Sequence, residues 1–489
     1  MRRPLPPAFE LLCAALSLAV AVSASETSPF ELALPVVPVE LDLHDCRIEI
    51  DTIGGAEPRL RVRTSPGDGG DTSEFEVSDA GGLIRIARID TGGVAAKTPT
   101  VELVLDPAQA LVIRGQGLSI SIRSPISPSL ESPLPKAAAG DDGSAPQTKP
   151  APYSFDLLDS EVYLVGTPAA TITGTNTVIH GEDGEGDLTV VLERGSLSLR
   201  RHEGRLHLKS SGSVCSVEDL NGTIDFALDG GSLDLSDGSG AVQGNARAGS
   251  MSLDRWTGTV RLTGEEATFE IRDGSLSQVN LTGTSTRLAL EGCRGSITAH
   301  LTGGTLTAEA LRGSLQATVA QDARVEVTHH EGPLTLAIRD NSSAEISEID
   351  GPVKTSVMQA ELRLAGATTL EMTASDARLT VARVRQITKF DAGASEYELD
   401  LRDTEGREFD LGVVHHGSAA TVLLASPCRV QLRASAAASD RVDVTGCEFQ
   451  MQYTGRWRGG DTRGIDGRPT FLLTAAVGEG SFLRVRGGP

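Results

Sequence analysis

The sequence is dominated by a short phrase that begins with Gly and places apolar residues two positions apart. In "GSLSLRRHEGRLHLKSS", from Gly195 to Ser211, the order is Gly, a small polar residue, an apolar residue, a polar residue and another apolar one. Glycines mark this phrase as far as Gly313 at a mean interval of about nine residues. Nine residues hold one short strand and a turn, but no helix-containing repeat. The repeat therefore predicts an all-β chain.

The alternation inside each phrase predicts one buried face, because successive side chains of a strand point to opposite sides. The predicted inward residues are Leu197, Leu199, Leu206, Leu208, Ile224, Phe226, Leu233 and Leu235. The residues predicted to face outward are Ser198, His207, Asp225 and Asp234. Glycine is expected to supply the backbone freedom at each corner.

Two arrangements satisfy this pattern: a parallel β-solenoid with two phrases per coil, or a long antiparallel meander. Beyond Gly313 the glycine interval doubles, and the next two markers are Gly332 and Gly351. Losing alternate corner glycines leaves the length of a coil unchanged, so the doubling favours coils. We predict a single-stranded parallel β-helix with about 18 to 19 residues per coil. The general preference of parallel crossovers makes it right-handed.

Composition divides the chain into four regions after its first residues. Residues 40–123 alternate apolar and polar in short runs and predict an N-terminal β-strand region. Residues 124–153 hold seven Pro and predict a linker or a surface loop. Residues 154–404 carry the solenoid repeat, and residues 405–489 are expected to form C-terminal strands that act as a cap. The larger side chains available for that cap are Trp457, Phe471 and Phe482.

The first 24 residues have the layout of a secretory signal peptide. Arg2 and Arg3 precede an apolar stretch from Leu11 to Val22, which a small-residue cleavage site at Ala24 follows. We therefore expect export to the periplasm, the outer surface or the medium. No later stretch reaches the ~18 apolar residues that a membrane helix needs.

The net charge of the chain limits the classes of partner that it can bind. Residues 1–24 contain two of the 44 basic and one of the 66 acidic side chains, so the mature chain stays strongly acidic, which disfavours nucleic acid and anionic membranes as partners.

Five cysteines remain after signal cleavage: Cys46, Cys215, Cys293, Cys428 and Cys447. Cys428 and Cys447 are one coil length apart, so in stacked coils they would lie roughly 4.8 Å from each other. We predict a disulfide between these two, and at least one free thiol elsewhere.

No catalytic, cofactor-binding or metal site is predicted. Asp225, Asp234 and Asp254 face outward and are expected to form a solvated acidic surface. The paired histidines His329–His330 and His415–His416 point to opposite faces of a strand, so neither pair chelates a metal by itself. Calcium-binding, phosphate-binding and nucleophile motifs are absent from the sequence.

Residues 40 to 400 resemble bacterial adhesin-like families that include the GIN domain of autotransporter adhesin heads. The opening strands, such as "CRIEID" and "LIRIARI", are similar to the start of those proteins. Pro107, Leu111, Gly115 and Gly117 occupy the equivalents of their passage into a single-stranded β-helix. The resemblance implies an exported β-helix with an adhesin-like role and without catalytic residues.

Three functional hypotheses remain open. The first is a non-enzymatic binding or scaffolding module that presents rows of polar side chains to an envelope polysaccharide or protein. The second is a polysaccharide-modifying β-helix enzyme, which needs a walled acidic cleft in residues 154–194 or near the C-terminus. The third is a self-assembling subunit resembling bactofilins, which uncapped solenoid ends would favour through self-association.

Overall fold

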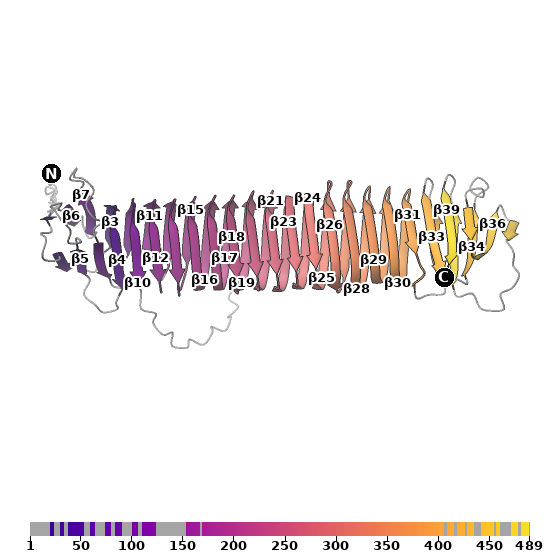
Figure 1. Cartoon of the computed structure of the whole chain (residues 1–489), viewed down its shortest axis with the longest axis horizontal. Coiled ribbons are helices and arrows are strands. Elements are labelled where there is room, and N and C mark those ends of the chain that lie inside the picture. Colours follow the sequence, from indigo (N-terminus) through magenta and orange to yellow (C-terminus); the bar gives the residue numbers. More distant parts are fainter. Residues whose placement is uncertain are drawn as a thin grey trace, which may run out of the picture. The chain divides into compact units, whose positions relative to one another are not determined.

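The structure is a computed structural model of the 489-residue chain. It describes residues 20–23, 30–33, 38–52, 59–63, 74–79, 84–89, 100–105, 110–123, 153–166, 169–404, 408–414, 418–425, 428–434, 442–453, 456–459, 471–477 and 481–488. The chain divides into two compact units, Met1–Asn221 and Gly222–Pro489, called unit 1 and unit 2. All regular secondary structure in the described residues is β-strand (Figure 1).

The strands of unit 1 are β1 (Val20–Ser23), β2 (Phe30–Ala33), β3 (Val39–His44), β4 (Arg47–Thr52), β5 (Arg59–Arg63), β6 (Glu74–Asp79), β7 (Ile84–Ile89), β8 (Thr100–Leu105), β9 (Leu111–Gln116), β10 (Ser119–Arg123), β11 (Tyr153–Leu158), β12 (Glu161–Val165), β13 (Ala170–Thr175), β14 (Val178–Glu182), β15 (Leu188–Glu193) and β16 (Ser196–Ser211). The next strand, β17 (Val214–Asp229), contains the division between the units.

The strands of unit 2 are β18 (Ser232–Ser236), β19 (Ser239–Arg247), β20 (Ser250–Asp254), β21 (Thr257–Glu265), β22 (Thr268–Arg272), β23 (Ser275–Glu291), β24 (Arg294–Glu309), β25 (Arg312–Ala320), β26 (Arg324–Glu331), β27 (Leu334–Arg339), β28 (Ser343–Met358), β29 (Glu361–Ser375), β30 (Arg378–Gly393), β31 (Glu396–Asp400), β32 (Glu408–Val414), β33 (Ala419–Ala425), β34 (Cys428–Ala434), β35 (Val442–Thr445), β36 (Glu448–Tyr453), β37 (Arg456–Gly459), β38 (Phe471–Val477) and β39 (Phe482–Gly488).

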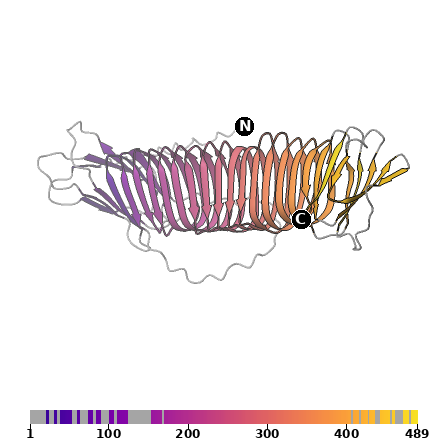
Figure 2. The same cartoon turned by 45° about the vertical axis from the view of Figure 1, so that its right-hand side comes forward.

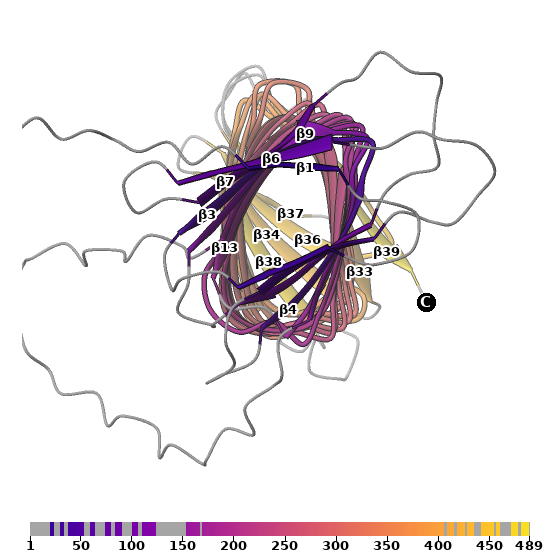
Figure 3. The ribbon, with the colours of Figure 1, turned by 90° about the vertical axis from the view of Figure 1, so that its left-hand side faces the viewer.

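In unit 1, two parallel sheets form opposite walls of the coils. One sheet pairs β3, β9, β11, β13, β15 and the second half of β16 in that order. The other pairs β4, β10, β12, β14 and the first half of β16. Each coil therefore gives one strand to each sheet, and Figure 3 shows these strands around a closed outline.

The register gives the length of a coil. In unit 1, Gly195 donates its N–H to the Ser213 hydroxyl on the following coil, a step of 18 residues. Unit 2 keeps that step where Ser232 faces Ser250. A bulge between Leu276 and Gln278 then lengthens the coil. Parallel pairing from coil to coil confirms the predicted β-solenoid and excludes the antiparallel meander (Figure 2).

A 19-residue coil also occurs further along unit 2. Ala323 donates its N–H to the Ser342 hydroxyl on the following coil, a step of 19 residues. The strands begin at the same step, since Arg324 faces Ser343. Both predicted coil lengths therefore occur, but they do not divide at the bulge, since steps of 18 residues return after it, as from Arg294 to Arg312, and a step of 17 occurs from Glu361 to Arg378.

The predicted alternation of inward and outward residues is confirmed. All eight residues predicted to face inward are buried, among them Leu206, Ile224 and Leu233 at 0 % exposure. The same position in successive coils is filled by apolar side chains that stack, as where Leu188 lies on Leu206. The core of each unit is thus a narrow column of aliphatic layers, which suits a chain with only 3 % aromatic residues.

Glycine supplies part of the backbone freedom at the corners, as predicted, with φ of 133° at Gly204 and 140° at Gly258. The left-handed backbone positions are held mostly by other residues, such as Asp183, Arg201 and Arg255, with φ of 55°, 51° and 49°. Asp183 and Arg255 each donate the backbone N–H to a carbonyl of the next coil. Glycine is required instead where coils approach most closely. A Cβ on Gly332, whose φ is 129°, would lie 2.1 Å from the carbonyl oxygen of Gly313.

Antiparallel strands occupy the N-terminal end of unit 1. β7 joins one parallel sheet beside β3, and β6 and β1 extend it antiparallel. β8 joins the other sheet beside β4, and β5 and β2 follow antiparallel. β1 belongs to the predicted signal peptide, so signal cleavage after Ala24 would leave β6 as the outer strand of its sheet.

The Pro-rich segment connects two described strands. The strands on its two sides are β10, which ends at Arg123, and β11, which begins at Tyr153. β11 pairs with β9, and β12 pairs with β10. The strands on the two sides of the segment therefore belong to consecutive coils. Residues 124–152 themselves lie outside the described residues.

The end of the chain is inserted into unit 2 and does not simply follow the preceding coils. One sheet runs β32, β38, β34, β36 and β37, and β33, β39 and β35 pair in that order beside it. The last coil, β38 and β39, thus lies between two coils that precede it in the chain. β37 pairs antiparallel with β36 at the end of this sheet.

The three large residues expected in a cap are spread over this region. Trp457 lies on β37, at the end of its sheet, and Phe471 lies on β38. The side chains of both lie outside the described residues. Phe482 lies instead on β39, which is paired on both sides. A cap in this region therefore does not rest on Phe482.

Candidate binding surface

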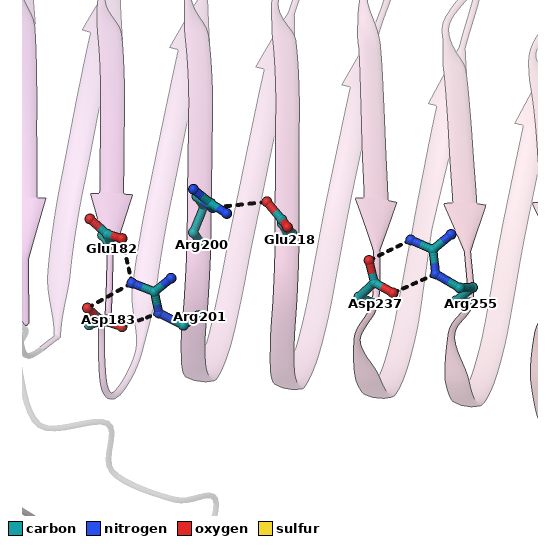
Figure 4. Close-up of polar contacts among 7 residues, drawn as sticks. All are labelled: Glu182, Asp183, Arg200, Arg201, Glu218, Asp237 and Arg255. Atoms are coloured by element: carbon teal, nitrogen blue, oxygen red, sulfur yellow. Dashed lines mark hydrogen bonds and ion pairs between the residues drawn. The ribbon is translucent and has the colours of Figure 1, made fainter.

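Each coil has two corners, and one of them carries a row of paired charges in each unit. In unit 1, Arg201 reaches back to Asp183 on the preceding coil (Figure 4). Its Nε donates to Asp183 Oδ1 at 2.6 Å and its Nη2 to Oδ2 at 3.1 Å, and Nη2 also donates to Glu182. On the adjoining strands, Arg200 Nε lies 3.0 Å from Glu218 Oε2.

The same arrangement recurs in unit 2. Arg255 holds both oxygens of Asp237 at 2.6 Å and also donates to Asp254 (Figure 4). Arg255 and Asp237 both occupy left-handed positions one coil apart, so their side chains leave the corner in the same direction and meet. Such a two-point pair fixes both orientation and charge. We call this the charged corner.

At the charged corner, each arginine stabilises the ionised form of the aspartate on the preceding coil. The hydrogen bond from Arg201 lowers the pKa of Asp183, and that from Arg255 lowers the pKa of Asp237. The same bonds raise the pKa of both arginines. These carboxylates are held in the ionised form by their neighbours, whereas the general acid of a glycoside hydrolase needs a raised pKa. The row thus links coil to coil.

The opposite corner of unit 2 is hollowed into a trough of about 720 Å³. Its outer row consists of four residues with left-handed backbone, one from each coil: Asn341, Gln359, Asp376 and Ala394. Its second row begins the following strands and consists of Ser343, Glu361, Arg378 and Glu396, each in register with the next. We call these two rows, with the small residues between them, the trough.

The trough is hollow because the residues between its rows are small and turned inward. Ser342, Ala360 and Ala377 are 1 %, 9 % and 5 % exposed. The Ser342 hydroxyl accepts the backbone N–H of Ala323 at 3.2 Å, which satisfies a buried corner donor. Two rows of mostly polar side chains, the outer of which ends in Ala394, therefore flank a shallow depression one residue wide.

The polar groups of the trough are of mixed kind. Its rows hold amides, a hydroxyl, three carboxylates and one guanidinium, with Arg378 Nε 3.2 Å from Glu396 Oε2. That pair is largely exposed, at 68 % and 64 %. Coils repeat at roughly 4.8 Å, so donors and acceptors recur along the trough at that interval. This arrangement suits a linear ligand with repeated hydroxyl groups more than a compact charged one.

The acidic residues named from the sequence are not brought together. Asp225 lies on β17 and Asp234 on β18, on the two sides of the corner at Gly230 and Gly231. Asp254 is held by Arg255. Sequence reasoning missed both the charged corner and the trough.

The histidine pair within the described residues separates as expected. His329 is exposed and its Nε2 lies 2.5 Å from Glu348 Oε2, whereas His330 is buried. The described residues contain no cluster of three or more metal-binding side chains. His415 and His416 lie outside those residues.

Cysteine pairing is partly visible. Cys46 and Cys293 are free and buried, Cys215 is also buried, and Cys447 is disulfide-bonded. Arg429 lies opposite Glu448 in the parallel pair β34 and β36, so the residues just before them, Cys428 and Cys447, occupy neighbouring register positions. The Cys428 side chain lies outside the described residues, so the predicted bond between these two stays a prediction. Peptide mapping without reduction tests it.

Residues 154–194, where an enzymatic cleft was considered, form regular coils in their described part. The turn between β11 and β12 consists of Asp159 and Ser160 alone, and that between β13 and β14 of Asn176 and Thr177. These two turns are too short to wall a groove, whereas the turn between β14 and β15 is longer and runs from Asp183 to Asp187.

No helix able to cross a membrane occurs in the part of the chain that the structure describes. No protein family, curated protein or solved structure matches the chain.

Proposed function

We propose that this chain is an exported, non-enzymatic binding module of the cell envelope, adhesin-like or scaffolding in role, whose trough holds a linear polysaccharide. The observation that carries the proposal is the pair of polar rows along one corner of four successive coils. The rows offer hydrogen-bond donors and acceptors at a fixed interval, as a polymer of hydroxyl-bearing units requires.

Charge favours a neutral polymer over an acidic one. The chain carries a net charge of −22, and the trough itself holds Glu361, Asp376 and Glu396 against Arg378. A polyanion would meet repulsion from both the local and the overall field. Neutral sugars instead gain hydrogen bonds to carboxylates and amides without that cost.

The first test is binding of the purified chain, without residues 1–24, to an array of neutral and acidic cell-wall and capsular glycans. New reducing ends are assayed in the same wells. Binding to neutral glycans without new reducing ends is the expected result. New reducing ends would identify a hydrolase, and an absorbing unsaturated product a lyase. Absence of binding would contradict the proposal.

A variant of the trough tests whether the glycan binds there. The triple substitution N341A/Q359A/D376A removes the polar groups of the outer row without touching the buried residues between the rows. Its matched control is R255A, which removes a long polar side chain from the charged corner of the same unit. Only the trough variant should lose binding.

Export is tested separately by N-terminal sequencing of the chain recovered outside the cytoplasm. The proposal expects a mature chain that begins at Ser25. Retention of residues 1–24 in the exported protein would contradict cleavage, and recovery of the whole chain in the cytoplasm would contradict export.

A further inference from the structure

An exposed aromatic pair lies on one sheet of unit 1. Tyr163 on β12 and His180 on β14 face each other in register. Their ring centroids are 4.9 Å apart and their planes differ by 20°, so the rings stack. Tyr163 is 40 % exposed, and no other Tyr, Phe or Trp side chain is exposed among the residues whose burial the structure describes. Because the chain has so few aromatic residues, an exposed tyrosine stacked on a histidine is a candidate contact for a ligand.

The row that contains this pair leaves one face of the tyrosine ring beside a small residue. Outward positions in register run Glu49, Ser121, Tyr163, His180 and Ser198. His180 covers one face of Tyr163, and the strand on the other side carries Ser121. Beyond Ser121 comes Glu49, two strand spacings or roughly 10 Å from Tyr163. Only a hydroxymethyl group stands between those two long side chains.

Polar groups surround this position. Tyr163 Oη donates to Glu161, whose Oε1 also lies 3.9 Å from His180 Nε2. Glu49 Oε1 lies 3.0 Å from Arg47 Nη2. An aromatic face with carboxylates and a guanidinium at its edges has the composition of a sugar-binding platform. The ring receives C–H groups while the charged groups accept or donate hydrogen bonds to hydroxyls.

We propose that Tyr163, stacked on His180 and opened by Ser121, is a subsite for one pyranose ring of a neutral, β-linked glucose-type polysaccharide. Such a sugar has equatorial substituents and so presents a flat face of axial C–H groups to the tyrosine. Glu49 and Glu161 disfavour uronic acids at the same place. This inference rests on the proposed function, of which it specifies the sugar class and a second point of contact.

The experiment is calorimetric titration of the purified chain with cellohexaose and chitohexaose, with hexagalacturonic acid as the acidic probe. Y163A should weaken binding of the neutral probes about tenfold, the change expected from losing an aromatic contact. Y163F keeps the ring without the hydroxyl and should stay within about twofold of the wild type. S121R fills the position beside the ring and should weaken binding as Y163A does.

The control is V214A, which shortens an exposed apolar side chain of the same unit at 58 % exposure. It should leave binding unchanged, and all variants should melt with the wild type. Equal affinity of Y163A and wild type overturns the subsite, as does stronger binding of hexagalacturonic acid than of the neutral probes.

The trough variant separates this inference from the proposed function. If N341A/Q359A/D376A loses binding while Y163A and S121R do not, the trough stands and the Tyr163 subsite falls. If Y163A and S121R lose binding, the subsite is supported whatever the trough variant does. If the wild type binds none of the probes, both fall.

Discussion

The two corners of unit 2 share a backbone design and differ in what their side chains do. Asp237 and Arg255 at the charged corner, like Gln359 and Asp376 at the trough, have a left-handed backbone with φ between 49° and 54°. Each donates its N–H to the following coil. At the charged corner, however, a two-point arginine–aspartate pair joins successive coils. The trough carries the amides of Asn341 and Gln359 beside a single-contact pair, Arg378 with Glu396. Charges that bind one another across coils are therefore distinct from the mixed polar groups to which we assign binding in the proposed function.

The largest expected effect comes from breaking a close contact between two successive coils of unit 2. G332A adds a Cβ 2.1 Å from the carbonyl oxygen of Gly313, at a φ of 129°. We expect it to lower the free energy of unfolding by about 3 kcal/mol, since strain and contact add. Urea denaturation measures this. G488A is the matched control, because a Cβ there has nothing within 4 Å. Equal loss in both variants would refute the role assigned to the close approach.

The next largest effect is a difference in glycan affinity between variants of the two corners. Removing the outer row of the trough should weaken binding of a neutral glycan at least tenfold, or about 1.4 kcal/mol, because several hydrogen bonds are lost together. R255A should leave binding within experimental error. Calorimetry on both variants with the same glycan gives the ratio of their dissociation constants. A larger loss in R255A than in the trough variant would reverse the assignment of the two corners.

A smaller effect concerns the inside of the charged corner, where His202 and His330 are buried. Burial lowers the pKa of both below the ordinary value of 6.5. As pH falls below 6.5, the unfolded chain takes up protons that the folded chain still excludes. Stability should therefore be full above that pH and decline as the pH falls from 6.5 toward 5. Thermal melts across this range measure the decline.

The matched variant for this pH dependence is H202L. Leucine occupies the comparable place after the left-handed residue Asp219, where Leu220 is 1 % exposed, so the substitution fits the fold. H202L should flatten the decline toward pH 5. An unchanged pH profile in H202L would contradict the assignment of this decline to His202.

The smallest expected effect is on the stability of the charged corner itself. Arg255 and Asp237 are exposed at 56 % and 44 %, so solvent screens their attraction. R255A should lower the melting temperature slightly in low salt and not at all in high salt. Melts at the two salt concentrations test this. A large loss that persists in high salt would show that the pairs hold the coils together.

Much of the fold was predictable because it follows from local repetition. The apolar alternation of Leu197, Leu199, Leu206 and Leu208 and the even spacing of Gly313, Gly332 and Gly351 were enough to predict coils and their inward faces. The charged corner also had a signal, since charged residues recur there once per coil, at Asp183, Arg201, Asp219, Asp237, Arg255 and Asp273. That signal is visible only once the sequence is aligned by coil rather than by the shorter phrase.

Other features could not be derived from the pattern. The trough arises from small inward residues such as Ala360 and Ala377, which look like any other residues of the repeat. The insertion of β38 and β39 between earlier coils has no local signal, because strands of similar composition can pair in several orders. The role of Tyr163 depends on Ser121 and His180, which lie beside it on adjacent coils but far from it in the sequence.

The central claim is that the trough binds a linear neutral glycan along successive coils, and the most direct measurement is affinity as a function of glycan length. The outer row spans three coil steps, roughly 14 Å in all. Titrating the wild type with oligosaccharides of increasing length should show affinity rising over the first few sugar units and then levelling off. The trough variant should lose that rise. Affinity that is independent of length in the wild type, or a rise that persists in the variant, would contradict the account.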